Sequence, residues 1–362
     1  MKEISRLNYT PIIACLLCCL LIGCTVVGPK SIRSGRMAYN EAISETNNQQ
    51  ILKIVVQDRY EERGNLLAVS SVTANVKISS RASVQAGFGS IDNYEGNLTP
   101  FSGGVIYEEN PTISYVPVDG ESYLRQVMAP LPISLLAQLT SKLSVSKGSI
   151  YILVSSVNGV YNPGFLNADE EIDPRFDRFA SIMSELTDAH RLQWAQDPVQ
   201  EGTFMLLIDQ ADPAYAGRVR ELQDLAGLPV SAPSDDLLVI PVNLAWQGND
   251  QGGLAITTRS VWELVDILAS AVDVPDEDLA AGIARQPAKQ GQVGRQLRVH
   301  HSDSKPDHAY IAVAYRGGWF YIDERDLETK RYFKLMGALW SSTIADSTAR
   351  HSAPILTVPV SR

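Results

Sequence analysis

The chain has 362 residues, of which 45% are hydrophobic and 20% are charged, and its formal net charge at pH 7 is −10. This composition is typical of a folded globular body and not of a disordered chain. The length suffices for one large domain or two ordinary ones. The negative charge argues against non-specific binding to nucleic acid and against a body that lies flat on anionic lipid.

The first 23 residues have the three parts of an export signal. Lys2 and Arg6, partly offset by Glu3, form a short basic region, and an uncharged apolar run follows from Ile12 to Ile22. This run is too short to cross a hydrocarbon core of about 30 Å as a helix, which takes roughly 20 residues. The sequence therefore predicts a signal peptide over residues 1–23.

The end of this leader, Leu21-Ile22-Gly23-Cys24, resembles the lipobox of bacterial lipoproteins. The resemblance implies that the Cys24 thiol takes a diacylglyceryl group and that a signal peptidase cuts between Gly23 and Cys24. It also implies that the new amino terminus is acylated, with fatty acids such as palmitate. Several acyl chains are needed because one myristoyl chain gives only marginal, reversible membrane binding.

The residue after Cys24 bears on which membrane holds the lipoprotein. In enteric bacteria an Asp at this position tends to retain lipoproteins in the inner membrane, whereas this chain has Thr25. The resemblance therefore favours the outer membrane, with the body on its periplasmic face rather than on the cell surface.

The distribution of cysteines agrees with this interpretation. All four lie in the leader or at its cleavage point: Cys15, Cys18, Cys19 and Cys24. The body after the lipidated residue cannot form an internal disulfide, although the periplasm would permit one. It also cannot use a thiol nucleophile or a cysteine metal ligand.

Residues 24–64 are expected to form a lipidated tether that leads into helix. Helical spacing runs over residues 32–43, and Asn47 with Gln50 resembles a capping box before a second apolar helical segment at residues 51–56. Gly64 is a plausible C-terminal stop. We expect this helical region to pack on the body.

Residues 65–165 are expected to form a first α+β domain. Apolar and polar residues alternate over residues 71–79, which predicts a half-buried strand. Residues 105–107 and 112–116 flank a turn and predict a hairpin. A helix over residues 121–142 should be interrupted at Pro130 and Pro132, and the apolar run at residues 151–157 fits either a strand or a helix.

A segment rich in Pro, Gly and acidic residues, from about Asn162 to Pro174, is the best candidate for a domain boundary. It would separate the first domain from a second α+β domain at residues 166–362. The expected elements of the second domain are helices at 175–195 and 213–225, strands at 203–208, 236–246 and 253–257, a helix capped by Thr258 or Ser260, a hairpin at 310–315 and 319–322, a helix at 326–340 and a strand at 355–360. Helices without regular βαβ alternation predict an α+β fold with mostly antiparallel sheets.

Two short motifs suggest chemistry but do not match complete signatures. His300, His301 and His308 lie near Asp303 and Asp307, but their spacing fits no zinc pattern, and we interpret them as part of a solvated loop. Ser144 to Lys147 spells Ser-x-x-Lys, without the Ser-Asp-Asn and Lys-Thr-Gly motifs that penicillin-interacting serine enzymes also need. We therefore predict neither a metal site nor a catalytic serine.

Four carboxylates near the C-terminus raise the alternative of a glycosidase-like site. They are Asp323, Glu324, Asp326 and Glu328, and aromatic residues on the predicted hairpin precede them. Paired carboxylates beside aromatics hold and cut sugars in glycosidases, but acidic residues also stabilise the first turn of a helix. Because no phosphate-binding Gly loop, Gly-x-Ser-x-Gly elbow or EF-hand is present, we predict no catalytic residue and no cofactor.

Residues 28–36 and 315–323 are similar to segments of uncharacterised proteobacterial lipoproteins, a group to which we attach no activity. From the anchor and the absence of a catalytic signature in the sequence, we expect a non-enzymatic envelope lipoprotein that binds or scaffolds an envelope partner protein. The alternative is a periplasmic hydrolase that acts on cell-wall or carbohydrate substrate.

Overall fold

The computed structural model describes residues 27–64, 66–73, 76–84, 101–109, 112–118, 120–141, 147–166, 170–171, 173–198, 203–225, 236–245, 253–291, 293–349 and 356–359. The chain divides into two compact units. Residues 1–47, 68–116 and 354–362 belong to the first, which we name the ribbon unit. Residues 48–67 and 117–353 belong to the second, which we name the main unit.

The two units differ from the two domains expected from sequence. The segment from Asn162 to Pro174 falls inside the main unit, because β5 (Val154–Val157) before it pairs with β11 (Leu254–Thr258) beyond it. The expected division lay between residues 165 and 166. The observed units instead separate residues 68–116, together with both ends of the chain, from the rest. The fold is α+β, as predicted.

The first described helix, α2, runs unbroken from Val27 to Arg59. The capping box predicted at Asn47 is wrong, because Asn47 lies inside this helix. No Gly or Pro interrupts residues 44–50, and polar residues of that kind can continue a helix. Gly64 is not the helix cap either. It lies against Ile54, where a Cβ at position 64 would come within 2.7 Å of Ile54 Cγ1.

The ribbon unit is built from paired strands. β2 (Val76–Val84) pairs with β3 (Phe101–Glu109), and β4 (Thr112–Val118) lies between β1 (Leu66–Thr73) and β16 (Leu356–Pro359). The hairpin predicted between residues 105–107 and 112–116 is therefore wrong in its pairing. Glu108 and Glu109, assigned to a turn, instead continue β3, where they lie opposite Lys77 and Val76.

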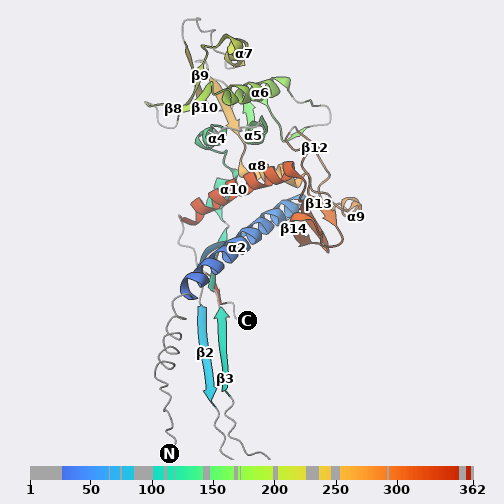
Figure 1. Cartoon of the computed structure of the whole chain (residues 1–362). Helices are drawn as coiled ribbons and strands as arrows, with labels where there is room; N and C mark the ends of the chain where they lie inside the picture. Colours follow the sequence, from blue (N-terminus) through green and yellow to red (C-terminus); the bar gives the residue numbers. More distant parts are fainter. Residues whose placement is uncertain are drawn as a thin grey trace, which may run out of the picture. The chain divides into compact units, whose positions relative to one another are not determined.

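The main unit contains a six-stranded sheet (Figure 1). Its order is β6 (Val160–Tyr161), β5, β11, β10 (Leu237–Leu244), β9 (Phe204–Asp209) and β8 (Leu192–Gln196). All neighbours are antiparallel except β10 and β11. The predicted strands at 203–208, 236–246 and 253–257 are confirmed.

Helices cover one face of this sheet. α5 (Lys147–Leu153) passes directly into β5, so the ambiguous run at residues 151–157 is part helix and part strand. α6 (Pro174–Asp188) buries Phe176, Phe179, Ile182, Met183 and Leu186, and α7 (Ala216–Leu225) packs against α6. The helix predicted to reach residue 195 ends at Asp188. The reason is that His190 takes a left-handed φ of 57°, after which the chain enters β8.

The remaining helices pack on one another, as expected from their apolar faces. α3 (Glu121–Met128) and α4 (Ile133–Thr140) are separated at the two predicted prolines. α8 (Val261–Ala269) begins with a capping box between Ser260 and Glu263. α10 (Leu327–Ala349) contacts α3 and α8, and its Tyr332 hydroxyl donates to the Leu264 carbonyl at 2.8 Å.

A smaller three-stranded sheet has the order β13 (His300–Ser302), β15 (Gly318–Asp323) and β14 (Ala309–Tyr315). The predicted hairpin is confirmed, because β14 and β15 pair across Arg316 and Gly317. These two residues have φ values of 48° and 84°, as a primed two-residue turn requires. The other short elements are β7 (Phe165–Leu166), which pairs with β12 (Lys289–Gln290), and α9 (Asp276–Ala280).

A buried polar contact fixes the junction of α5 with β5. Asn162 is 1% exposed, and its Nδ2 donates to the carbonyls of Tyr151 and Val154, both at 2.8 Å. The Arg259 backbone N–H donates to the Leu153 carbonyl at 2.8 Å, and the Arg259 guanidinium donates to the Asn162 carbonyl. Asn162 and Arg259 therefore donate to carbonyls at the α5–β5 junction that receive no hydrogen bond from the helix or from a neighbouring strand.

We expect Asn162→Ala to lower the free energy of unfolding of the main unit by about 2 to 4 kcal/mol, because it leaves two buried carbonyls without a donor. Denaturant unfolding followed by circular dichroism measures this loss. Asn243→Ala, at a partly exposed position of β10, serves as the control and should change stability by less than about 0.5 kcal/mol. Equal effects of the two substitutions would contradict the role given to Asn162.

Candidate functional site

The predicted lipid attachment residue, Cys24, lies outside the described residues, so its role stays a prediction. Within the described part of the chain, no helix is long and apolar enough to cross a membrane.

The histidines considered as metal ligands do not converge. His300 and His301 are neighbours on β13, and neighbouring residues of a strand face opposite sides of its sheet. His300 stacks on Tyr321 at 5.3 Å between ring centroids, while His301 packs on Phe320 at 5.0 Å. Among the residues that the structure describes, no group of three or more His, Cys, Asp or Glu is placed to hold a metal ion.

The Ser-x-x-Lys motif is only partly described. Ser144 lies outside the described residues, and Lys147 begins α5 with its Nζ 2.7 Å from Asp177 Oδ1. The Tyr151 hydroxyl donates to the same carboxylate. Lys147 is thus part of an α5–α6 contact.

The four C-terminal carboxylates each have a local partner. Asp326 caps α10, because its Oδ1 accepts from Thr329 N at 2.9 Å and its Oδ2 from the Thr329 hydroxyl at 2.6 Å. Asp323 accepts from the backbone N–H of Arg325 at 2.7 Å. Glu324 pairs with Lys330, and Glu328 pairs with Arg331 at 2.8 Å. These contacts favour the interpretation as helix-start and turn residues.

A dense charge cluster that sequence reasoning missed lies at the C-terminal end of α2. Arg285 is its centre and contacts three carboxylates: Asp58 at 3.1 Å, Glu61 at 3.3 Å and Asp266 of α8 at 2.7 Å. We name these four residues the Arg285 cluster. The only signal in the sequence was the run of charged residues after the apolar face of α2, and a run of that kind does not identify its partners.

A second set of contacts holds the residues just after Asp58. The Tyr60 hydroxyl donates to Asp278 at 2.7 Å, and the Arg316 guanidinium lies 4.8 Å from the centre of the Tyr60 ring. Tyr315 and Arg316 both donate to the Glu62 carboxylate. The end of α2 is thereby joined to the β14–β15 hairpin and to α9.

Burial and nearby charges alter the titration of this region. Burial raises the pKa of Asp58 to about 6, against the opposing effect of Arg285 and with a further rise from Asp266 and Glu61. Hydrogen bonds from Tyr315 and then Arg316 hold the pKa of Glu62 below its usual range. Burial, followed by repulsion from Arg285, lowers the pKa of Arg59, whose side chain is almost wholly buried.

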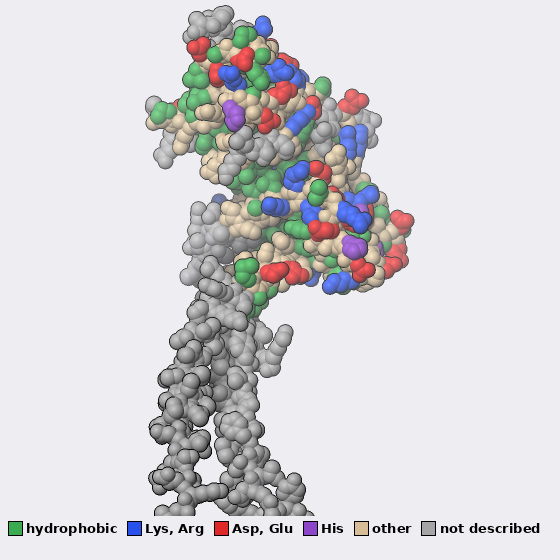
Figure 2. Space-filling model, viewed as in Figure 1, with side chains coloured by type: hydrophobic (Ala, Val, Ile, Leu, Met, Phe, Trp, Pro, Cys, Tyr) green, Lys and Arg blue, Asp and Glu red, His purple; other side chains and the backbone are tan. Residues whose placement is uncertain are grey.

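An open apolar surface lies on the six-stranded sheet, on the face away from α6. Leu237 and Val239 of β10 are 53% and 43% exposed, and Val239 lies opposite Leu207 of β9. Residues that alternate with them face the helices and are buried: Leu206, Ile208, Leu238, Ile240 and Val242. We name Leu237, Val239, Pro241, Met205 and Leu207 the open face. Hydrophobic and charged side chains are intermixed on the surface of the main unit (Figure 2).

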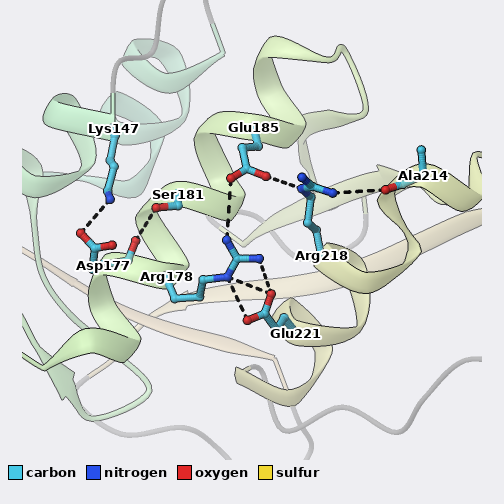
Figure 3. Close-up of polar contacts among 8 residues, drawn as sticks. All are labelled: Lys147, Asp177, Arg178, Ser181, Glu185, Ala214, Arg218 and Glu221. Atoms are coloured by element: carbon cyan, nitrogen blue, oxygen red, sulfur yellow. Dashed lines mark hydrogen bonds and ion pairs between the residues drawn. The ribbon is translucent and has the colours of Figure 1, made fainter.

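The helical side of the sheet carries ion pairs instead (Figure 3). Arg178 of α6 lies 2.5 Å from Glu221 of α7 and 3.7 Å from Glu185, which also pairs with Arg218. A cavity of about 360 Å³ lies beside them, lined by Asn158, Val160, Arg175, Arg178, Glu221, Asp224 and Leu225. Because Arg178 and Glu221 already neutralise each other, this cavity offers a ligand no unpaired charge from that pair, and the contacts join α7 to α6.

Comparisons with known proteins give no relative. No protein-family model, no curated protein and no solved structure matches the chain.

The raised pKa of Asp58 predicts a pH dependence of stability. A carboxyl group whose pKa is higher in the folded state binds protons more tightly there. Its contribution is therefore fully present below the unfolded pKa near 4 and is lost as pH rises through about 6. We expect the wild-type free energy of unfolding to fall by about 1 kcal/mol from pH 5 to pH 7.5 because of this residue.

Asp58→Asn should remove this part of the pH dependence, as measured by urea unfolding at the two pH values. Groups other than Asp58 are the same in both proteins and cancel in the comparison, and the pKa of Glu62 is lowered, away from this window. Asp303→Asn, at an exposed loop position, provides the control and should leave the pH dependence as in the wild type. A wild-type-like pH dependence in Asp58→Asn would show that Asp58 does not titrate as described.

Proposed function

We propose that this chain is a bacterial envelope lipoprotein, held by lipid on Cys24 in the outer membrane with its body on the periplasmic side. The lipobox-like Leu21-Ile22-Gly23-Cys24 supports the anchor. The same proposal gives the body a non-enzymatic role, as a module that binds or scaffolds another envelope protein.

The observation that carries the binding role is the open face. Its most exposed residues, Leu237 and Val239, are about half exposed although they lie within a sheet. Exposed apolar surface commonly marks sites of protein–protein contact. A carboxylate-based hydrolase site draws no comparable support, because Asp323 and Asp326 each accept hydrogen bonds from their own turn or helix start.

Loss of the lipidated thiol should abolish anchoring. In an export-competent bacterium, Cys24→Ser should leave unprocessed precursor and give no incorporation of radiolabelled palmitate. The reason is that acylation and cleavage both require the lipobox thiol in the bacterial lipoproteins that this sequence resembles. Cys19→Ser is the matched control, with a cysteine lost from the leader, and should still be labelled and cut. Cleavage and labelling that persist in Cys24→Ser would refute the anchor.

The binding role is tested by crosslinking in living cells with a tagged full-length chain. We expect one recurrent envelope protein in the purified product and its loss in Val239→Lys, which places a charge in the open face. Leu327→Lys is the control, because Leu327 is 65% exposed at the start of α10 and lies outside the open face. A partner retained equally by both variants would exclude the open face, and the recovery of no partner would contradict the scaffold role.

A further inference from the structure

Strand β8 ends the six-stranded sheet and leaves one of its edges without a neighbour in the described sheet order. The Asp209 N–H donates to the Arg191 carbonyl at 2.8 Å, and the Asp197 N–H donates to the Thr203 carbonyl at 2.9 Å. In an antiparallel ladder, alternate residues bond to the same neighbour. The N–H and C=O groups of Leu192, Trp194 and Gln196 therefore point away from β9.

Within β8 itself, this edge carries none of the residues that usually prevent pairing with another strand. Native edges are protected by Pro, by Lys or other charges, or by bulges. β8 has the sequence Leu-Gln-Trp-Ala-Gln, without a charge or a proline, and its register with β9 runs without a bulge from Leu192 to Gln196. The charged residues Arg191 and Asp197 stand immediately outside it, one at each end.

We infer that two copies of this chain pair through antiparallel β8 strands, about a two-fold axis at Trp194. Arg191 and Asp197 are equally far from Trp194, so this register places Arg191 of one copy opposite Asp197 of the second copy, at both ends of the ladder. Two-fold symmetry requires a self-complementary strand. The pattern of one basic end, an uncharged centre and one acidic end meets that requirement only when the strands are antiparallel.

The charges already present in the sheet extend this match. Arg191 Nη1 lies 2.5 Å from Asp209, and Arg191 Nη2 lies 3.4 Å from Asp212. The Arg191 side chain is still 28% exposed, and a guanidinium has five N–H donors. A carboxylate of the second copy would therefore add to a row in which Asp209, Arg191 and Asp197 alternate in sign across three strands.

The same register also gives Trp194 a polar neighbour. In the paired sheet, Gln196 of the second copy is the diagonal neighbour of Trp194 on the same side, within reach of a long side chain. An unrelated extended peptide could add to β8 as well, but it would not need the symmetric positions of Arg191 and Asp197.

The dimer goes beyond the proposed function and depends neither on the anchor nor on an envelope partner. It would join the open faces of two copies, because Gln193 and Ala195 lie in register with Leu207 and Met205 of that face. A failure of the dimer would therefore leave the lipoprotein and scaffold proposals standing, and their failure would leave the dimer.

Charge reversal tests the register in the full-length chain, solubilised in detergent and measured by light scattering after gel filtration. Asp197→Lys and Arg191→Glu each place like charges opposite one another at both ends, and each should weaken dimerisation about tenfold or more. A mixture of the two variants restores opposite charges at both ends and should dimerise as the wild type does. Asp303→Lys, with the same change in net charge at an exposed loop, should remain dimeric.

A wild-type chain that is monomeric, an Asp197→Lys chain that dimerises as the wild type does, or a mixture that stays monomeric would each overturn the inference. Because Arg191→Glu also removes ion pairs within the chain, a second measurement uses cysteine pairs. Gln193 and Ala195 of the second copy would be a non-hydrogen-bonded pair with Cα atoms about 4.5 Å apart, within the range that a disulfide can bridge. Gln193→Cys/Ala195→Cys should yield a disulfide-linked dimer, while Gln193→Cys alone should not exceed the wild-type background; equal yields would reject this register.

Discussion

The architecture of the main unit depends on satisfying the buried carbonyls where α5 turns directly into β5. A helix leaves its last carbonyls without intrahelical donors, and a strand that begins at once cannot supply them. Asn162 and Arg259 supply the donors from two other segments. Arg259 does this with its backbone N–H, while its side chain, which is 2% exposed, donates to the Asn162 carbonyl. Burial, the principal cause, lowers the pKa of the Arg259 guanidinium. The Arg259 carbonyl also accepts from Leu131 N at 3.0 Å, so separate parts of the chain meet at this residue.

The two ends of the six-stranded sheet differ in how their faces are covered. At the β5–β11 end, residues on both sides of the sheet are buried, among them Val154, Ser156, Ala255 and Ile256. At the β8–β10 end, alternate residues on one side remain exposed. A sheet with one covered and one open face is ordinary for antiparallel strands, but the open side is then usually polar. Here it carries Leu237, Val239 and Leu207, and this departure is the physical basis for the binding role that we propose.

Signals carried by a few neighbouring residues predicted part of the local structure. The β14–β15 hairpin lies where it was expected, and Ser260, one of the two expected caps, begins α8. The capping box expected at Asn47 and the helix stop expected at Gly64 were wrong. Pairing between distant strands was not predictable in the same way. β3 and β4 were both recognised as strands, yet their partners are set by contacts with β2, β1 and β16. The overlong helix at residues 175–195 failed for a related reason, because Leu192 and Trp194 continue an apolar spacing that suits either a helix or a strand until β9 provides a partner.

Charged residues show the same limit more sharply, because a charge in a sequence does not reveal what neutralises it. Arg285 lies 227 residues from Asp58, yet it is the cation that faces this carboxylate. The pairing does not compensate completely: burial raises the pKa of Asp58, Arg285 opposes this rise, and the negative charges of Asp266 and Glu61 add to it. Arg191 also contacts more than one carboxylate, but its partly exposed guanidinium has more N–H donors than these two contacts use. The first arrangement makes the end of α2 sensitive to protons, whereas the second leaves a sheet edge able to accept one more carboxylate. Arg191 and Asp197 are equally far from Trp194 in the sequence. This spacing bears on pairing with a second copy only because residues 192–196 form an edge strand in register with β9, and the sequence alone does not specify that register.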